Sequence, residues 1–452
     1  MSGTDSSREG PPMPTTADAP PRAGRLQTVF GNLGWLLASN GLMAALSLVY
    51  VGIATRTLGV ADFGRFALIT GAAQTLATLA GFETWKIVVQ YGVEHQARGD
   101  AQALWRIEKA AACMELVAAL LGMVVLIALF MLWRQPFGLD DDVYPFAFGY
   151  AAIQLVTLRS TPTGILRLHD RFHLAAIADS AQPVGRLIGA LWALFFWPSV
   201  QGFLIGYAAA EILTALAYWL LVARLPDLRA MLRAPLDRRA VLRENPGLLH
   251  VMLSTNVQPT LGLASRQLPL LLVGGFAGPA AAGAFRLALQ LSNALSKLST
   301  LLTRAAFPEL VRSIRAVTGA GLGRLIGRIV LGSLAGGLVV MALVVLLGHP
   351  LLTLVGGRAF GIAYVLLLWL TAAGCVELAA AAIEPILLAL HRAGTAMLAR
   401  GGAVVIQFIL LALLLPDWGA LGASISIFLG SVVALILLGT SLMRARDRRE
   451  PA

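Results

Sequence analysis

The segment GAFRLALQLSNALSKLSTLLTR, residues 283–304, decides the fold of this chain. It is long and apolar enough to cross a bilayer as a helix, which takes about 20 residues. Six polar residues nevertheless recur in it at spacings of three or four: Arg286, Gln290, Asn293, Lys297, Thr300 and Arg304. A helix has about 3.6 residues per turn, so these side chains share one face over roughly 27 Å. The segment therefore predicts a membrane helix with one polar, cationic face.

The composition of the whole chain is that of a membrane protein. Of its 452 residues 58% are hydrophobic and only 13% are charged, whereas soluble proteins carry about 25% charged residues. The net charge of +11 comes mostly from arginines in short stretches between apolar runs, a pattern that argues against nucleic-acid binding. Cys113 and Cys375 lie far apart inside apolar segments, and no metal, nucleotide or cofactor motif appears. We therefore expect an integral membrane protein without a cofactor.

Successive apolar runs predict an all-α polytopic fold with about twelve transmembrane helices in two six-helix bundles. The predicted spans of the first half include residues 110–133 and 144–164. The longest stretch between spans, about Arg224 to Pro246, is rich in arginine and would join the bundles. The expected division is a disordered tail over 1–25, a bundle over 26–223, a basic linker over 224–247, a bundle over 248–443 and a basic tail over 444–452.

The distribution of basic residues predicts the orientation, because Lys and Arg concentrate in cytoplasmic loops. With the N-terminus in the cytoplasm, the outer loops contain only Arg56, Arg65, Arg134 and Arg358 as basic residues. These loops instead carry acids, including the run Asp140–Asp142. We expect both termini, the linker and the two tails to be cytoplasmic.

A short internal repeat supports the division into halves. LGVADFGRFALI (58–69) and AGPAAAGAFRLAL (277–289) share the pattern G-x4-G-x-F at a constant offset. Each copy is expected at an outer turn that leads into the second helix of its half. Duplicated halves of this kind are typical of transporters, whose substrate sites lie between the repeats.

Two further spans carry polar rows beside the stripe on 283–304. Arg266 lies in the span before it, and Asp179, Gln182 and Arg186 lie in the span over 174–197. Charged side chains within the bilayer usually face a polar cavity or a partner. Arginines along such a cavity suit phosphate or pyrophosphate, since guanidinium presents paired donors to phosphate oxygens.

The alternative interpretation is that these cations only pair with acids, for example Arg186 with Asp179 or Glu211. This alternative is weaker for the stripe as a whole, because no acid lies between Arg286 and Arg304. The expected substrate site thus comprises Arg266, Arg286, Lys297, Arg304, Arg186, Gln290 and Asn293.

Three acids lie deep in predicted spans: Glu211, Glu377 and Glu384. Together with Asp179 they are candidates for coupling, because a carboxylate inside the membrane can take up and release a proton or bind Na⁺. The alternative, which has equal weight, is that each is a fixed counter-ion for a cation of the cavity.

The segments RTLGVADFGRFALI (56–69) and GAFRLALQLSNALSKLSTLLTRAAFPELVRSI (283–314) resemble polysaccharide and O-antigen flippases. These proteins belong to the multidrug/oligosaccharidyl-lipid/polysaccharide exporter superfamily. The resemblance implies two bundles around a cavity that opens alternately to each side of the bacterial inner membrane. It also implies an undecaprenyl-pyrophosphate-linked oligosaccharide as substrate, with cavity cations at Arg266, Arg286, Lys297 and Arg304.

The expected function is therefore that of a flippase, not an enzyme, which moves a lipid-linked oligosaccharide to the periplasmic leaflet for O-antigen, capsule or exopolysaccharide synthesis. Its partners would be this substrate, membrane lipids and polysaccharide polymerase or assembly proteins, and no nucleic acid. Three alternatives remain open: an ion-coupled drug or metabolite exporter, a membrane glycosyltransferase or ligase, and a scaffold for an assembly complex. The exporter would be expected to have acids in its cavity, and the enzyme would need a larger extramembrane loop.

Overall fold

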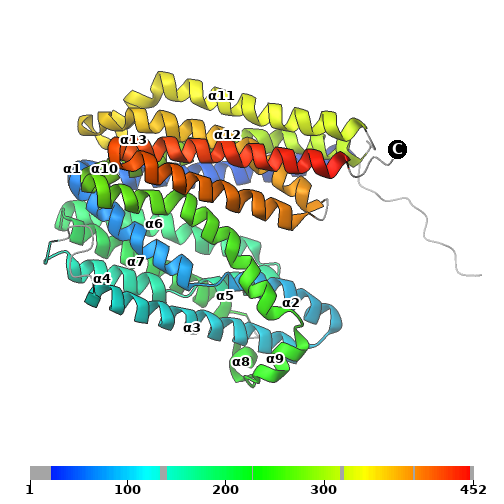
Figure 1. The fold of residues 1–452 in the computed structure, drawn as a ribbon. Helices are drawn as coiled ribbons and strands as arrows, with labels where there is room; N and C mark the ends of the chain where they lie inside the picture. Colours follow the sequence, from blue (N-terminus) through cyan, green and yellow to red (C-terminus); the bar gives the residue numbers. More distant parts are fainter. Residues whose placement is uncertain (1–21, 133–139, 226–227, 316–319, 390–391, 448–452) are drawn as a thin grey trace, which may run out of the picture. The chain divides into compact units, whose positions relative to one another are not determined.

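The computed structural model describes residues 22–132, 140–225, 228–315, 320–389 and 392–447, and every regular element in these ranges is a helix (Figure 1). Residues 1–42 and 43–452 are separate units, and the contacts described here all lie within 43–452. The predicted terminal tails, 1–25 and 444–452, fall largely outside the described residues.

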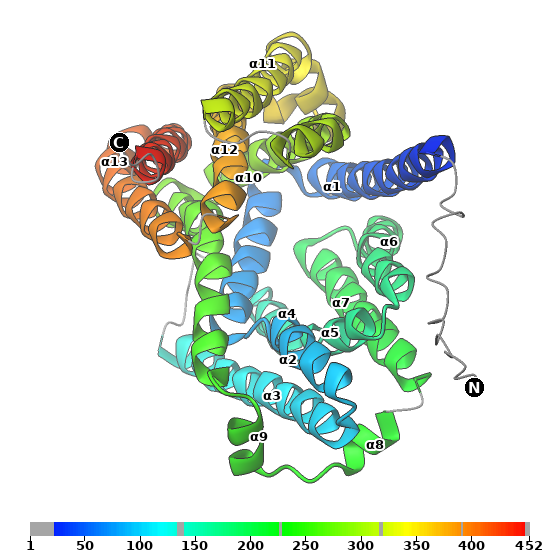
Figure 2. The same cartoon turned by 90° about the vertical axis from the view of Figure 1, so that its right-hand side faces the viewer.

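The helices follow one another along the whole chain. They are α1 (Arg22–Ala80), α2 (Thr84–Arg98), α3 (Ala101–Leu132), α4 (Tyr144–Val156), α5 (Ser160–Leu168), α6 (Phe172–Phe196), α7 (Val200–Ala223), α8 (Leu228–Arg233), α9 (Arg238–Glu244), α10 (Leu248–Arg315), α11 (Ala320–Gly356), the 3-10 helix η2 (Arg358–Ala363), α12 (Tyr364–Ala389) and α13 (Ala393–Asp447). Helix α6 packs on α7 in the first half, and α12 packs on α13 in the second (Figure 2).

Single glycines divide the three longest helices. Gly59 in α1, Gly278 in α10 and Gly419 in α13 have φ values of 73°, 84° and 52°, a region that L-residues with a Cβ rarely adopt. Seven described stretches are apolar and long enough to span a membrane, and the three that contain these glycines are 49 to 54 residues long. Each of these three stretches has the length of two crossings, so the seven stretches provide about ten. Helix α6 and the segment of α4 and α5 lie outside these stretches, and with them the total is compatible with about twelve.

The two copies of the internal repeat pack directly against each other. A Cβ added at Gly64 would lie 1.7 Å from the carbonyl oxygen of Pro279, and one added at Gly283 would lie 2.3 Å from that of Val60. Glycine is therefore required at both positions, because only a residue without Cβ lets the two backbones approach so closely. The repeated glycines thus form a tight contact between the two halves of the chain.

The predicted outer loops gather at the same end as this glycine contact. Arg65, one residue after Gly64, forms ion pairs with Asp62 at 3.1 Å and with Asp140 at 3.0 Å. The side chain of Thr55 donates to the carbonyl of Val355 at 3.0 Å and thereby joins α1 to α11. The two halves are thus in contact at the predicted outer end.

The predicted span over residues 144–164 is wrong as one continuous helix, because the structure interrupts it at Thr157–Arg159 between α4 and α5. Pro162 explains the break, since a proline ring in a helix clashes with the carbonyl four residues earlier. That carbonyl belongs to Leu158, and it accepts a hydrogen bond from Trp219 Nε1 at 2.8 Å. The carbonyl of Leu158 therefore keeps a hydrogen-bond partner despite the interruption.

The start of α5 is capped by a buried acid from α3. The carboxylate of Glu115 accepts hydrogen bonds from the backbone N–H groups of Arg159, Ser160 and Thr161 at 2.9, 2.8 and 2.8 Å. Free N–H groups at a helix start carry partial positive charge, so a carboxylate is favoured there. Glu115 therefore fixes the position of the interrupted segment.

Helices α2, α8 and α9 complete the first half outside the predicted spans. Helix α2 follows α1 after a short break at residues 81–83, and α3 begins at Ala101, nine residues before the predicted span. The stretch predicted as a basic linker contains α8 and α9. An ion pair at 2.8 Å between Arg106 and Glu244 holds α9 to α3.

Candidate functional site

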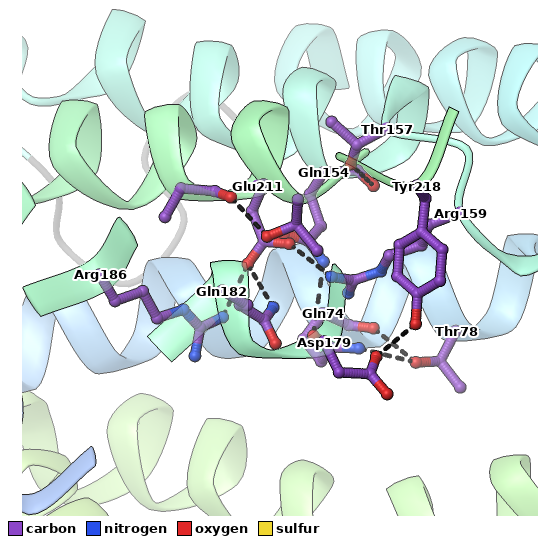
Figure 3. A network of polar contacts seen from close by, with 12 residues as sticks. Gln74, Thr78, Gln154, Thr157, Arg159, Asp179, Gln182, Arg186, Glu211 and Tyr218 are labelled. Carbon is purple, nitrogen blue, oxygen red and sulfur yellow. Dashed lines mark hydrogen bonds and ion pairs between the residues drawn. The ribbon is translucent and has the colours of Figure 1, made fainter. Parts of the chain in front are cut away.

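A buried carboxylate in the first half holds two guanidinium groups. Glu211 on α7 is fully buried, and three side chains donate to its oxygens. Arg159 Nη1 lies 2.9 Å from Oε2, whereas Arg186 Nη2 and Gln182 Nε2 lie 2.7 and 2.9 Å from Oε1. Figure 3 shows these donors converging on the carboxylate. One negative charge thus faces two positive charges.

Helix α10 adds a third cation from the second half of the chain. Arg286 is close enough to Arg186 for their charges to repel each other, and its Nη1 donates to Gln267 Oε1 at 3.3 Å. It forms no ion pair with any carboxylate that the structure describes. We call Arg159, Arg186, Arg286 and Glu211 the cationic cluster. Both halves contribute to it, and its positive charges outnumber its negative charge.

Tyrosine rings surround the cationic cluster. The guanidinium of Arg186 lies 5.0 Å from the centroid of the Tyr207 ring, which is within the range of a cation–π interaction. Tyr50 packs edge-on against Tyr207 with ring centroids 5.8 Å apart. The Tyr207 ring stabilises Arg186 without neutralising its charge, so the cluster keeps its excess of positive charge.

The cationic cluster is chemically suited to phosphate. Cations within a membrane are costly unless water, a polar partner or an anion compensates them. A guanidinium group presents two parallel N–H donors that match two oxygens of one phosphate. Three guanidinium groups with a single carboxylate therefore suit a ligand with more than one negative charge, such as a pyrophosphate.

The second half contains a different, charge-balanced network. Arg266 Nη2 lies 2.6 Å from Glu377 Oε2, and its Nη1 donates to Asn293 Oδ1 at 3.2 Å. Arg400 on α13 lies 3.7 Å from Glu377 and is also hydrogen-bonded to Glu384. Two guanidinium groups therefore face two carboxylates, and Arg266 is paired with an acid in this structure.

The polar stripe predicted over residues 283–304 consequently faces two neighbourhoods. Arg286 belongs to the cationic cluster, Asn293 belongs to the network of the second half, and between them Gln290 donates to Ser47 on α1 at 2.9 Å. The side chains of Lys297 and Arg304 lie outside the described residues. The predicted residues are thus divided between two sites.

Asp179 lies beside the cationic cluster rather than in it. The hydroxyl of Tyr218 donates a hydrogen bond to its carboxylate, and Figure 3 shows the two side chains pointing toward each other. Of the two acids named as alternative partners for Arg186, the structure therefore pairs this cation with Glu211.

Arg159 was missed by the sequence analysis although it is one of the three cations. It lies inside a predicted span, at the break between α4 and α5. Pro162, three residues after Arg159, could have indicated the break, because a proline within a span interrupts the helix. An arginine next to such a break is exposed to whatever space the interruption opens.

Each half contains a cavity that is lined in part by its charged residues. A cavity of about 450 Å³ in the first half is lined by Arg159, Gln182 and Asp179. A cavity of about 470 Å³ in the second half is lined by Arg266, Glu377 and the amides of Asn293 and Gln407. Arg159 of the cationic cluster and Arg266 of the second network therefore border open space.

Comparisons with known proteins agree with this architecture. Residues 29–314 match the family described as Polysaccharide biosynthesis protein. Inner membrane protein YghQ of Escherichia coli (strain K12) is 31% identical over 344 residues, which cover 75% of this chain and 96% of that protein.

Two solved structures have the same fold at low sequence identity. Lipid II flippase MurJ in an inward closed conformation gives a TM-score of 0.69 at 12% identity, over 91% of this chain and 88% of that one. An inward-facing multidrug resistance MATE family transporter of the MOP superfamily gives 0.66 at 16%, over 90% and 96%. The predicted all-α polytopic membrane fold is thereby confirmed.

Family and fold together define the class of protein. The family is described by its part in polysaccharide biosynthesis, and the relative from Escherichia coli is a protein of the inner membrane. This chain belongs to the polysaccharide biosynthesis protein family and is a multi-pass protein of the bacterial inner membrane.

Proposed function

We propose that this protein is a flippase for an undecaprenyl-pyrophosphate-linked oligosaccharide. It would move this lipid from the cytoplasmic to the periplasmic leaflet for the synthesis of O-antigen, capsule or exopolysaccharide. The observation that carries the proposal is the cationic cluster, in which Arg159 and Arg186 share the single carboxylate of Glu211 and Arg286 adds a third positive charge beside Arg186. A pyrophosphate supplies the negative charge that this cluster lacks.

The physical problem of flipping is the transfer of a charged head group across hydrocarbon. An unpaired ion is strongly disfavoured in an apolar medium, so the head group needs compensating charges along its route. Arg186 and Arg286 come from different halves of the chain, and a bound pyrophosphate would bridge them. Closure of the two halves around the head group would follow from its contacts with both.

The glycine contact at the predicted outer end supports an alternating mechanism. With Gly64 against Pro279 and Gly283 against Val60, the halves touch at that end. Access in this state would be from the cytoplasmic side, where the lipid-linked substrate is assembled. Release into the outer leaflet would require these two backbones to separate.

The acids would have two distinct roles. We propose that Glu211 holds Arg159 and Arg186 in position, because it accepts hydrogen bonds from both. Glu377 and Glu384 remain candidates for coupling to H⁺ or Na⁺, each paired with an arginine that substrate binding could draw away. Asp179 is a candidate of the same kind, beside the cationic cluster.

Complementation in a deletion strain tests this function. Arg186→Gln and Arg286→Gln should each reduce surface polysaccharide strongly, and the double variant should abolish it, with membrane levels of the protein unchanged. Arg98→Gln is the matched control, since this exposed arginine pairs with Glu94 on the surface of α2. Full export by the double variant would refute the proposal. A strain with normal polysaccharide but altered drug susceptibility would instead favour the exporter alternative.

A further inference from the structure

A second feature of the first half lies directly beside the cationic cluster. The cavity of about 450 Å³ is bordered by the break at residues 81–83, the break at 157–159 and the start of α10. Arg159 and Gln182 line this cavity and also bond to Glu211. A ligand whose phosphates occupy the cationic cluster would therefore extend into the cavity.

The polar side chains that line this cavity and the smaller one that adjoins it are mainly neutral. The amide and hydroxyl side chains are Gln74, Thr78, Gln154, Thr157, Ser160, Thr163, Gln182, Thr214 and Asn256. Aromatic side chains also border it, among them Phe82, Trp85 and Tyr218. Amides and hydroxyls beside aromatic rings suit a ligand that is uncharged and rich in hydroxyl groups.

One of these amides has an unused acceptor. Gln154 on α4 is only 7% exposed, and no described residue donates to its Oε1. Its Nε2 approaches Gln74 Oε1 at 3.5 Å, and Gln74 Nε2 in turn lies 3.3 Å from the hydroxyl of Thr78 (Figure 3). A buried polar atom without a partner is costly, so this oxygen is a ready acceptor for an O–H or N–H donor of a ligand.

The acids at the cavity already have partners. The carboxylate of Asp179 accepts from Tyr218, and Glu83 forms an ion pair with Lys86. The groups left to meet a ligand are therefore mostly neutral donors and acceptors, which favours a sugar over a metal ion.

The walls are held in place by bonds across the breaks. Asn256 on α10 accepts from the backbone N–H of Glu83 at 3.1 Å and donates to the carbonyl of Gly81 at 3.3 Å. Glu115 fixes the second break through the N–H groups of residues 159–161. Interrupted helices that border a cavity are typical of substrate sites in transporters.

We propose that this cavity binds the first sugars of the head group, those attached directly to the pyrophosphate. Gln154, Gln74 and Thr78 would recognise sugar hydroxyl or acetamido groups and set the specificity for the saccharide. This assignment rests on the proposed function, because the cationic cluster must hold the pyrophosphate beside the cavity.

The test compares lipids that differ only in the sugar. The purified full-length protein in lipid nanodiscs is titrated with undecaprenyl pyrophosphate. It is then titrated with the same lipid carrying one N-acetylglucosamine, one N-acetylgalactosamine or one galactose. At least one sugar should raise the affinity roughly tenfold over the bare lipid, the effect of one or two good hydrogen bonds.

The variants separate the sugar site from the phosphate site. Gln154→Leu and, independently, Gln74→Leu should remove the gain from the sugar, whereas Arg186→Gln/Arg286→Gln should weaken binding of all four lipids. Gln90→Leu, at an exposed position on α2, is the matched control and should keep the gain. Thermal unfolding verifies that each variant is folded.

The outcomes distinguish the two proposals. If the bare lipid binds but none of the three sugars raises its affinity, the sugar site is overturned while the proposed function stands. The same holds if the gain survives in both glutamine variants. If the bare lipid fails to bind the wild-type protein, the proposed function itself fails, and the sugar assignment falls with it.

Discussion

Replacing Gly64 by alanine should drive the two halves apart at the predicted outer end. In the structure the new Cβ would lie 1.7 Å from the carbonyl oxygen of Pro279 and 2.5 Å from its carbon, whereas ordinary contacts begin at 3.4 Å. The atoms that Cβ would meet belong to backbone, so no side-chain rotation relieves the clash. The two segments must therefore separate by roughly 1.5 Å or more.

The expected size of the effect follows from the cost of overpacking. Inserting a methyl group into a tight contact typically costs about 1–3 kcal/mol, and this cost applies only while the halves touch. A change of about 1.4 kcal/mol is tenfold in an equilibrium constant. The equilibrium should therefore shift toward the outward-open state by roughly 5-fold to 150-fold.

Spin labels on the two halves measure this shift. Cys113 and Cys375 are first replaced by serine, and spin labels are then attached to cysteines introduced at Asp62 and Arg358. Pulsed electron paramagnetic resonance then measures the distance between α1 and η2. Gly64→Ala should add or enlarge a population at longer distance. Gly149→Ala is the control, because a Cβ there would meet no atom within 4 Å. An unchanged distance distribution in a folded Gly64→Ala protein would refute the role assigned to the glycine contact.

Three further substitutions test the buried polar contacts. Glu211→Gln removes the only carboxylate of the cationic cluster and should lower the free energy of unfolding by about 3–5 kcal/mol. Thermal unfolding in detergent measures this loss, and an unchanged melting temperature would mean that Arg159 and Arg186 do not need the Glu211 carboxylate. Glu115→Gln should weaken the cap of α5 by about 1–3 kcal/mol and increase hydrogen exchange at residues 157–161, and unaltered exchange there would contradict the capping role. Glu377→Gln should release Arg266 and raise the affinity for inorganic pyrophosphate, measured by calorimetry, whereas an equal or lower affinity would show that the pair does not restrain this arginine.

The sequence predicted the class of fold because membrane helices are specified locally. Each crossing needs only a run of apolar residues, and its length is set by the bilayer. The repeat of Gly59, Gly64 and Phe66 at Gly278, Gly283 and Phe285 also indicated the relation between the halves. The structure adds the reason for the repeat: the second glycine of each copy packs against the other copy.

The pairing of charges could not be predicted in the same way. Arg266 and Glu377 are in separate helices and meet only through tertiary packing, as do Arg186 and Glu211. The periodicity of residues 283–304 correctly places polar groups on a helix, but it does not say which neighbour each one meets. Different parts of this helix contact different neighbours, so its polar residues are divided between the cationic cluster and the network around Arg266.

The interrupted helices were the main omission. Residues 144–164 are apolar enough to be interpreted as one span, and only Pro162 indicates a break. The role of Arg159 depends on that break and on the cap from Glu115, which lies in a different helix. Helices that border substrate sites in transporters are often interrupted. A prediction based on continuous apolar runs does not detect such interruptions.

Transbilayer movement of the substrate in proteoliposomes tests the central claim most directly. Vesicles are loaded with undecaprenyl-pyrophosphate-linked saccharide, and a membrane-impermeant glycosidase reports how much lipid becomes accessible with time. The wild-type protein and the Arg98→Gln control should expose the inner-leaflet lipid, and Arg186→Gln/Arg286→Gln should leave it protected as in empty vesicles. Movement by the double variant at the wild-type rate would contradict the claim that these arginines carry the pyrophosphate across the membrane.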